Sequence, residues 1–133
     1  MSLHTGCIKV KHSSLKGLLI SVMNRHTLED GKTPNPEIVE GKNYVWHWPE
    51  LGPPSVLLGD YYKRNLPWEE FEKRYLEHLR TPEIVGSLHK LIELARTQEA
   101  IVLCVETTPE HCHRRLLAEE CQRLAPDLKI DVQ

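Results

Sequence analysis

Residues 101–117 read IVLCVETTPEHCHRRLL and predict a buried strand followed at once by a helix. The uninterrupted apolar run Ile101–Val105 is typical of a strand buried on both faces, as the strands of parallel sheets are. Thr108 and Pro109 then provide an N-cap and a first-turn proline, and the helix is predicted to continue to about Ala125. This order of elements indicates an α/β fold.

The rest of the chain supports the same class. Three further segments have the apolar patterns of strands: 8–12, 18–23 and 128–132. Three others have the apolar spacing of helices: 55–62, 67–79 and 82–95. With 133 residues the chain is long enough to bury one core. We therefore expect residues 1–133 to form a single three-layer α/β domain, with a mostly parallel central sheet and helices on both faces.

Charge and composition narrow the classes of function. The net charge is −2, so the bulk electrostatic field does not favour nucleic acid as a partner. No membrane association is expected, because no apolar stretch approaches the roughly 20 residues that cross a bilayer, and no signal peptide is visible. The four cysteines have no Cys-x-x-Cys spacing and are expected to be reduced thiols of a cytoplasmic protein. The oligomeric state stays open.

Reactive side chains gather where the strand gives way to the helix: Glu106, Cys112, His113 and Arg114. Ligands of α/β domains bind at the carboxyl ends of strands, so we expect the candidate site at this junction. On a helical wheel His113 falls on the buried face, toward the sheet, whereas Arg115 falls on the opposite face.

The thiol and the imidazole each have two interpretations. Cys112 is a thiolate nucleophile, which the helix N-terminus and neighbouring cations favour, or it is a small buried residue. His113 is a general base or thiol partner, or it is a core histidine that bonds a strand carbonyl or Glu106. The sequence leaves both alternatives open.

The charged candidates have two interpretations as well. Arg114 binds an anion together with the N–H groups of the first helical turn, or it forms an ion pair with Glu106. Arg25, which follows the apolar run 18–23, has the same alternatives. Glu106 is an acid or orients His113, or it is the partner in that ion pair.

We expect no metal and no cofactor. His111, Cys112 and His113 are metal-ligand types, but adjacent helical residues point about 100° apart and do not easily converge on one ion. Structural zinc sites also favour pairs spaced by about two to four residues. The phosphate-binding, dinucleotide-binding, metalloprotease and serine-hydrolase motifs are absent from the sequence.

The segment also resembles a known family. The C-terminal signature of the domain-of-unknown-function 488 family is a strand, Cys-x-Glu, an acidic turn, and Cys-His-Arg at the start of a helix. Five residues match that signature: Cys104, Glu106, Cys112, His113 and Arg114. Upstream, Leu51–Leu58 and Trp68–Phe71 look like further helices of that family, and Arg25 resembles a basic residue that it carries after a strand. The resemblance implies a fold and a candidate site. It implies no reaction.

Two functions follow from these observations. The first is an enzyme that acts on a small anionic substrate, phosphorylated or nucleotide-like. The second is a non-catalytic ligand- or partner-binding module in which the Cys-His-Arg cluster is structural. The segment 30–54, with five prolines, is a long loop of the kind that is usually functional. We expect its parts Trp46–Trp48 and Pro49–Ser55 to border the site.

Overall fold

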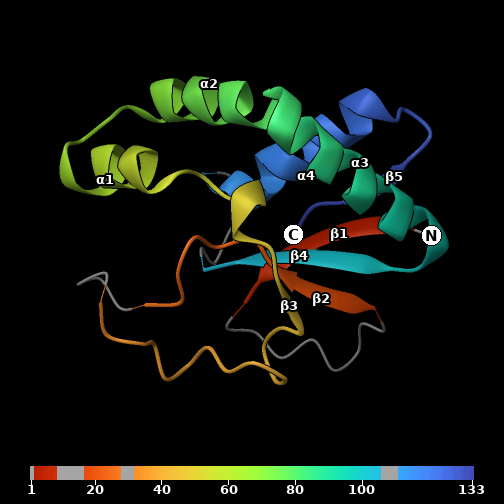
Figure 1. The fold of residues 1–133 in the computed structure, drawn as a ribbon, viewed down its shortest axis with the longest axis horizontal. Coiled ribbons are helices and arrows are strands. Elements are labelled where there is room, and N and C mark those ends of the chain that lie inside the picture. The colour runs from red at the N-terminus through yellow and green to blue at the C-terminus, as the bar shows by residue number, and fades with distance from the viewer. Residues whose placement is uncertain (1, 9–16, 28–31, 106–110) are drawn as a thin grey trace.

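The structure, a computed structural model, describes residues 2–8, 17–27, 32–105 and 111–133. Five strands form one sheet: β1 (Ser2–Cys7), β2 (Leu18–Ser21), β3 (Trp46–His47), β4 (Ala100–Cys104) and β5 (Lys129–Asp131). Their order across the sheet is β3-β2-β4-β1-β5, and every pair is parallel (Figure 1). The carboxyl ends of the strands therefore lie at one edge of the sheet.

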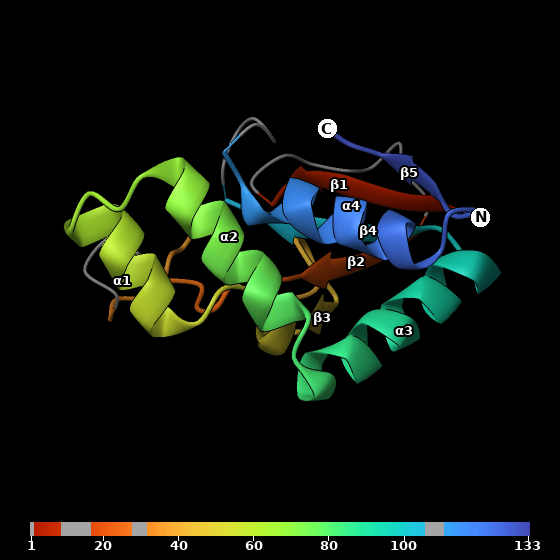
Figure 2. The same ribbon diagram turned by 90° about the horizontal axis from the view of Figure 1, so that it is seen from above.

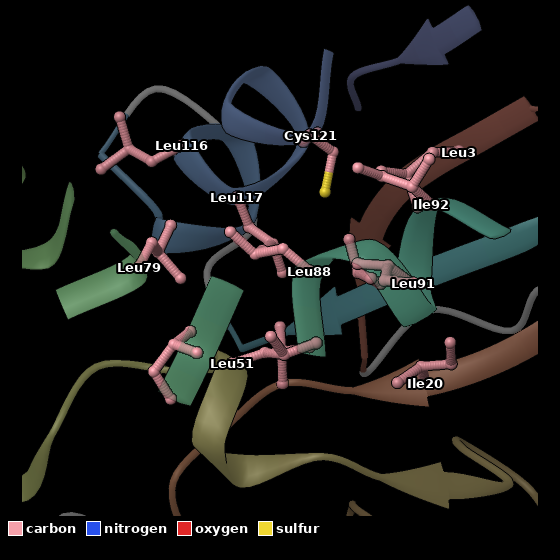
Figure 3. Close-up of a cluster of buried hydrophobic side chains, with 14 of the residues drawn as sticks. Leu3, Ile20, Leu51, Leu79, Leu88, Leu91, Ile92, Leu116, Leu117 and Cys121 are labelled. Atoms are coloured by element: carbon pink, nitrogen blue, oxygen red, sulfur yellow. The ribbon is translucent and has the colours of Figure 1, made fainter. Parts of the chain in front are cut away.

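The helices cover one face of this sheet (Figures 1 and 2). They are the short 3-10 helix η1 (Pro49–Leu51) and the α-helices α1 (Ser55–Lys63), α2 (Trp68–Leu79), α3 (Pro82–Thr97) and α4 (His113–Leu124). Their buried side chains form one cluster with Ile20 and Val22 on the β2 side and with Ala100 and Val102 of β4. Figure 3 shows Leu88, Leu91 and Leu117 close together at its centre.

The opposite face of the sheet carries a smaller apolar cluster. Ile101 and Leu103, which alternate with the helix-facing residues of β4, pack there with Ile38, and Tyr44 lies against them. The α/β class and the parallel sheet are confirmed. We expected helices on this second face too; among the residues that the structure describes, the loop that contains Ile38 and Tyr44 covers it instead.

Chain direction explains this one-sided arrangement. From β3 to β4, and again from β4 to β5, the chain moves across the sheet in the same direction by two positions. Right-handed crossovers that move in one direction place their helices on one face. The step from β2 to β3 moves the opposite way, so a right-handed connection places Ile38 and Tyr44 on the other face.

The first strand begins earlier than the sequence pattern predicts. β1 ends at Cys7, and residues 9–16, which include most of the predicted strand 8–12, lie outside the described residues. β1 pairs with β4 through residues that include Gly6, and glycine has little strand preference of its own. Thr5 is fully buried, and its hydroxyl donates to the carbonyl oxygen of Gln133 at 3.1 Å. Pairing within the sheet overrides local preference here.

No helix in the described part of the chain is both long enough and apolar enough to span a membrane.

A buried carboxylate joins α2 to α4. Arg80, which follows α2, donates two hydrogen bonds to Glu120 at 2.9 and 3.1 Å, and Arg123 donates two more at 2.9 Å. The Glu120 side chain is only 2% exposed. Hydrogen bonds from Arg123 and Arg80 lower the pKa of Glu120 from 4.5 to about 2, although burial opposes the shift.

We expect Glu120→Gln to destabilise the fold by about 2 kcal/mol at neutral pH, since both arginines are half-exposed and partly screened by water. A pKa below the ordinary value means that the ionised group stabilises the fold above about pH 4.5, and that this contribution is lost as the pH falls toward 2. Urea unfolding between pH 7 and 2.5 should show a shallower decline for the variant than for the wild type. Glu119→Gln, at an exposed pair with Arg115, is the matched control and should change stability by less than about 0.5 kcal/mol.

One glycine is required by a close backbone approach. A Cβ on Gly52 would lie 2.2 Å from the carbonyl oxygen of Val22 and 3.3 Å from that of Pro49. The loop after η1 can therefore rest on the end of β2 only while residue 52 has no side chain.

Gly52→Ala should destabilise the protein by about 1–3 kcal/mol, because both clashing atoms belong to the backbone and cannot rotate away. Gly86→Ala is the control: it lies inside α3, has nothing within 4 Å of its added Cβ, and should stabilise by about 0.5–1 kcal/mol. Tryptophan fluorescence during urea unfolding measures both. Equal stabilities for the two variants would contradict the packing argument.

Candidate functional site

The candidate site lies at the carboxyl edge of the sheet, where three segments meet. Cys104 ends β4, Val22 follows β2, and Cys112 immediately precedes α4. Because the sheet is parallel, the ends of β2 and β4 are neighbours, and Val22 N–H donates to the Leu103 carbonyl at 3.1 Å. The start of α4 closes the group from the helical side of the sheet (Figure 1).

α4 begins later than predicted. Its first residue is His113, and Cys112 is an N-cap with extended backbone, φ −131° and ψ 139°. The predicted start at Thr108 and Pro109 lies outside the described residues, as does Glu106. The helix start at residue 113 corrects the prediction. Cys112 precedes the helix, so a helical wheel does not give the direction of its side chain.

His113 points toward the sheet, as the wheel predicted. Its Nε2 donates to the carbonyl oxygen of Val22 at 3.0 Å, and its ring meets that of Tyr75 edge-on with centroids 5.7 Å apart. Burial lowers the pKa of His113 to about 4, and Arg114 contributes to that direction. The imidazole is therefore neutral at pH 7, with its proton on the nitrogen that bonds Val22.

Arg114 is fully buried, with 0% exposure. Its Nε donates to the carbonyl oxygen of Gln133 at 3.0 Å, and its Nη1 to the sulfur of Cys112 at 3.5 Å. The guanidinium therefore lies inside the protein and ties the start of α4 to Gln133. Arg115 lies on the outer side and pairs with Glu119 at 2.8 Å.

Cys104 and Cys112 form a disulfide, with their Cα atoms 7.5 Å apart. Four reduced thiols were expected, and the structure corrects this for these two. Their separation of eight residues matches no common cysteine motif, so only the meeting of a strand end with a helix N-cap reveals the pair. Cys7 and Cys121 are buried and do not take part in the disulfide, and burial raises the pKa of Cys121 to about 12.

The same two sulfurs lie beside an imidazole. Among the described residues, Cys104, Cys112 and His113 each offer a ligand atom, and the three atoms lie within 4.8 Å of one another. The sequence argument against a metal assumed that Cys112 and His113 were successive helical residues. The extended backbone at Cys112 removes that assumption.

Arg25 is exposed and follows β2 at the same edge. It comes three positions after Val22, whose carbonyl accepts the hydrogen bond of His113. The described structure thus groups Cys112, His113 and Arg114 tightly and leaves Arg25 at the surface nearby.

A second polar group at this edge escaped the sequence analysis. The Ser21 hydroxyl is hydrogen-bonded to Nε2 of His26 at 2.5 Å, and the His26 ring lies against those of Tyr44 and His47, at 4.5 and 4.3 Å between centroids. Burial and the neighbouring His47 lower the pKa of His26 to about 4. The only signal in the sequence was that Ser21 interrupts an apolar run.

The two loop segments expected near the site lie at the end of β2. Trp48 N–H donates to the Ser21 carbonyl at 2.8 Å, and the Ser55 hydroxyl donates to Oδ1 of Asn24 at 3.1 Å. Of the tryptophan pair, Trp48 packs against the core while Trp46 is 48% exposed. Between β3 and α3 lies an open cleft of about 1000 Å³, lined by both tryptophans and by residues of α3 that include Lys90.

Arg114→Ala should destabilise the fold by about 3 kcal/mol, because it removes a charged donor from two acceptors and leaves space in the core. Arg115→Ala is the neighbouring control and should cost less than about 1 kcal/mol, since its pair with Glu119 is partly exposed. Thermal unfolding with circular dichroism measures both. Similar losses in the two variants would contradict the structural role assigned to Arg114.

Comparison with protein families matches residues 29–121 to the family described as Domain of unknown function DUF488. The matched range contains the five residues of the C-terminal signature on which the resemblance was based: Cys104, Glu106, Cys112, His113 and Arg114. No curated protein and no solved structure matches the chain. The family match covers well over half of the 133 residues, and with it the chain belongs to the Domain of unknown function DUF488 family.

Proposed function

We propose that the protein is an enzyme that acts on a small anionic molecule, with the thiol of Cys112 as its reactive group. One observation carries this proposal: the Cys112 sulfur lies at the N-cap of α4 and 3.5 Å from Nη1 of Arg114. A helix N-terminus and an adjacent cation both favour the thiolate, which is the nucleophilic form of cysteine.

The neighbouring residues take roles that fit this reaction centre. Arg114 supports the thiolate of Cys112, since its buried guanidinium bonds the sulfur. Neutral His113 is held by Val22 and is available to accept or transfer a proton. Arg25, the exposed cation at this edge, binds the anion. Glu106, which the sequence analysis predicts as an acid at this junction, is proposed as the acid of the site.

A second candidate is a non-catalytic binding module. The burial of Arg114 and Cys112 favours this candidate, because a buried Cys-His-Arg cluster can stabilise the fold without taking part in a reaction. The cleft beside β3, with an exposed tryptophan and Lys90, would then bind the ligand. The two candidates differ in what they require of Cys112.

Alkylation of the reduced, metal-free protein separates them. If the enzyme proposal holds, iodoacetamide labels Cys112 at least about 10-fold faster than Cys7 or Cys121 at pH 7, because Cys112 has the N-terminus of α4 and the guanidinium of Arg114 beside it. Peptide mass spectrometry assigns the labelled residue. Labelling of Cys112 no faster than of Cys7 or Cys121 would contradict the proposal and favour the binding module.

The anion is tested in the same assay. Phosphate should slow the labelling of Cys112 in the wild type and in Lys129→Met, but not in Arg25→Met. Lys129 is the control because it is an exposed cation at the start of β5, which in a parallel sheet is the edge opposite to the candidate site. Protection that survives in Arg25→Met would remove Arg25 from the site.

A further inference from the structure

We infer that Cys104, Cys112 and His113 form a binding site for one zinc-class divalent metal ion when the two cysteines are reduced. The ligand atoms of the three residues lie within 4.8 Å of one another and come from two elements, the end of β4 and the start of α4. Two thiolates and one imidazole are a donor set that zinc favours.

The hydrogen bond of the His113 imidazole leaves one ring nitrogen able to bind a metal ion. Nε2 of His113 donates to the Val22 carbonyl at 3.0 Å, so its proton is on Nε2 and the lone pair is on Nδ1. Metal-binding histidines usually donate their second N–H to a backbone carbonyl or a carboxylate in this way. The carbonyl of Val22 is itself fixed by the close approach of Gly52.

The cysteine backbones are spaced more widely than is usual for a disulfide. Their Cα atoms are 7.5 Å apart, beyond the usual range of about 4.4–6.8 Å. Two thiolates bound tetrahedrally to one zinc ion at about 2.3 Å lie roughly 3.8 Å apart, which suits the wider spacing. The reduced pair would therefore accept an ion without drawing β4 and α4 together.

The charges are compatible with a cation. Binding converts two thiols into thiolates and releases their two protons to water, so the divalent ion and its two sulfur ligands carry no net charge. Arg114 then faces a neutral centre and keeps its hydrogen bond to the Cys112 sulfur. A tetrahedral ion held by these three residues has a fourth position for water or another ligand.

Metal binding does not depend on the proposed enzymatic function, although the two share Cys112. A bound ion uses one lone pair of the Cys112 thiolate and withdraws electron density from the sulfur, so the metal-bound thiolate is a weaker nucleophile than the free one. Zinc should therefore protect Cys112 from iodoacetamide. Fast labelling of Cys112 in a protein that binds no metal would support the enzyme proposal and contradict the metal site. Metal binding to a Cys112 that is not reactive would support the metal site and contradict the enzyme proposal.

The test is a titration of the phosphine-reduced, anaerobic protein with Co²⁺ as a spectroscopic probe. One ion per chain should bind, with a sulfur-to-cobalt charge-transfer band in the near ultraviolet and the visible bands of tetrahedral cobalt, and Zn²⁺ should displace it. Cys104→Ala and Cys112→Ala should abolish the charge-transfer band, and His113→Ala should weaken binding at least about 100-fold, more than the loss of an outer hydrogen-bond partner costs. Cys7→Ala and Cys121→Ala are matched controls and should bind as the wild type does.

X-ray absorption of the zinc-loaded wild type gives a result that does not depend on variants folding. It should show two sulfur neighbours at about 2.3 Å and one imidazole nitrogen at about 2.0–2.1 Å. Absence of sulfur from the coordination shell would overturn the inference. So would loss of the cobalt band in Cys121→Ala together with its retention in Cys104→Ala.

Discussion

The position of β4 at the centre of a parallel sheet constrains the rest of the molecule. β4 pairs with β1 on one side and with β2 on the other, so all five of its residues are buried. Parallel pairing requires each connection to return across the sheet, and the handedness of those returns places α1 to α4 on one face. It also brings the ends of β2 and β4 together at one edge, and the candidate site is built at that edge.

Polar groups at this edge are buried and need partners, and the partners connect distant segments. His113 bonds the carbonyl after β2, Arg114 bonds the C-terminal Gln133, and the Tyr75 hydroxyl donates to the Leu51 carbonyl at 2.5 Å. Each bond satisfies a group that would be costly to bury alone. The site and the fold therefore share the same interactions, and a substitution here changes stability as well as chemistry.

Cys112 is the residue on which both proposals depend, and its position explains why. As an N-cap it has extended backbone, so its sulfur can point toward Cys104 while His113, one residue later, points toward Val22. The helix N-terminus and Arg114 favour the thiolate. A thiolate in this position can attack a substrate, bind a metal ion or pair with Cys104, and only one of these at a time.

By itself, the sequence determined the α/β class, the parallel sheet, the family and the location of the candidate site. These follow from local patterns: an apolar run in β4, helical spacing in α2 and α3, and a strand-to-helix junction rich in reactive groups. Local patterns also predicted that His113 faces the sheet. Only the tertiary structure decided that Arg114 is buried and that Cys104 meets Cys112, because both depend on segments brought together by strand order. The hydrogen bond between Ser21 and His26 depends instead on how the chain turns just after β2. The helix start at His113 and the loop covering the second face were likewise decided by packing and by the direction of the crossovers, which no short window of sequence contains.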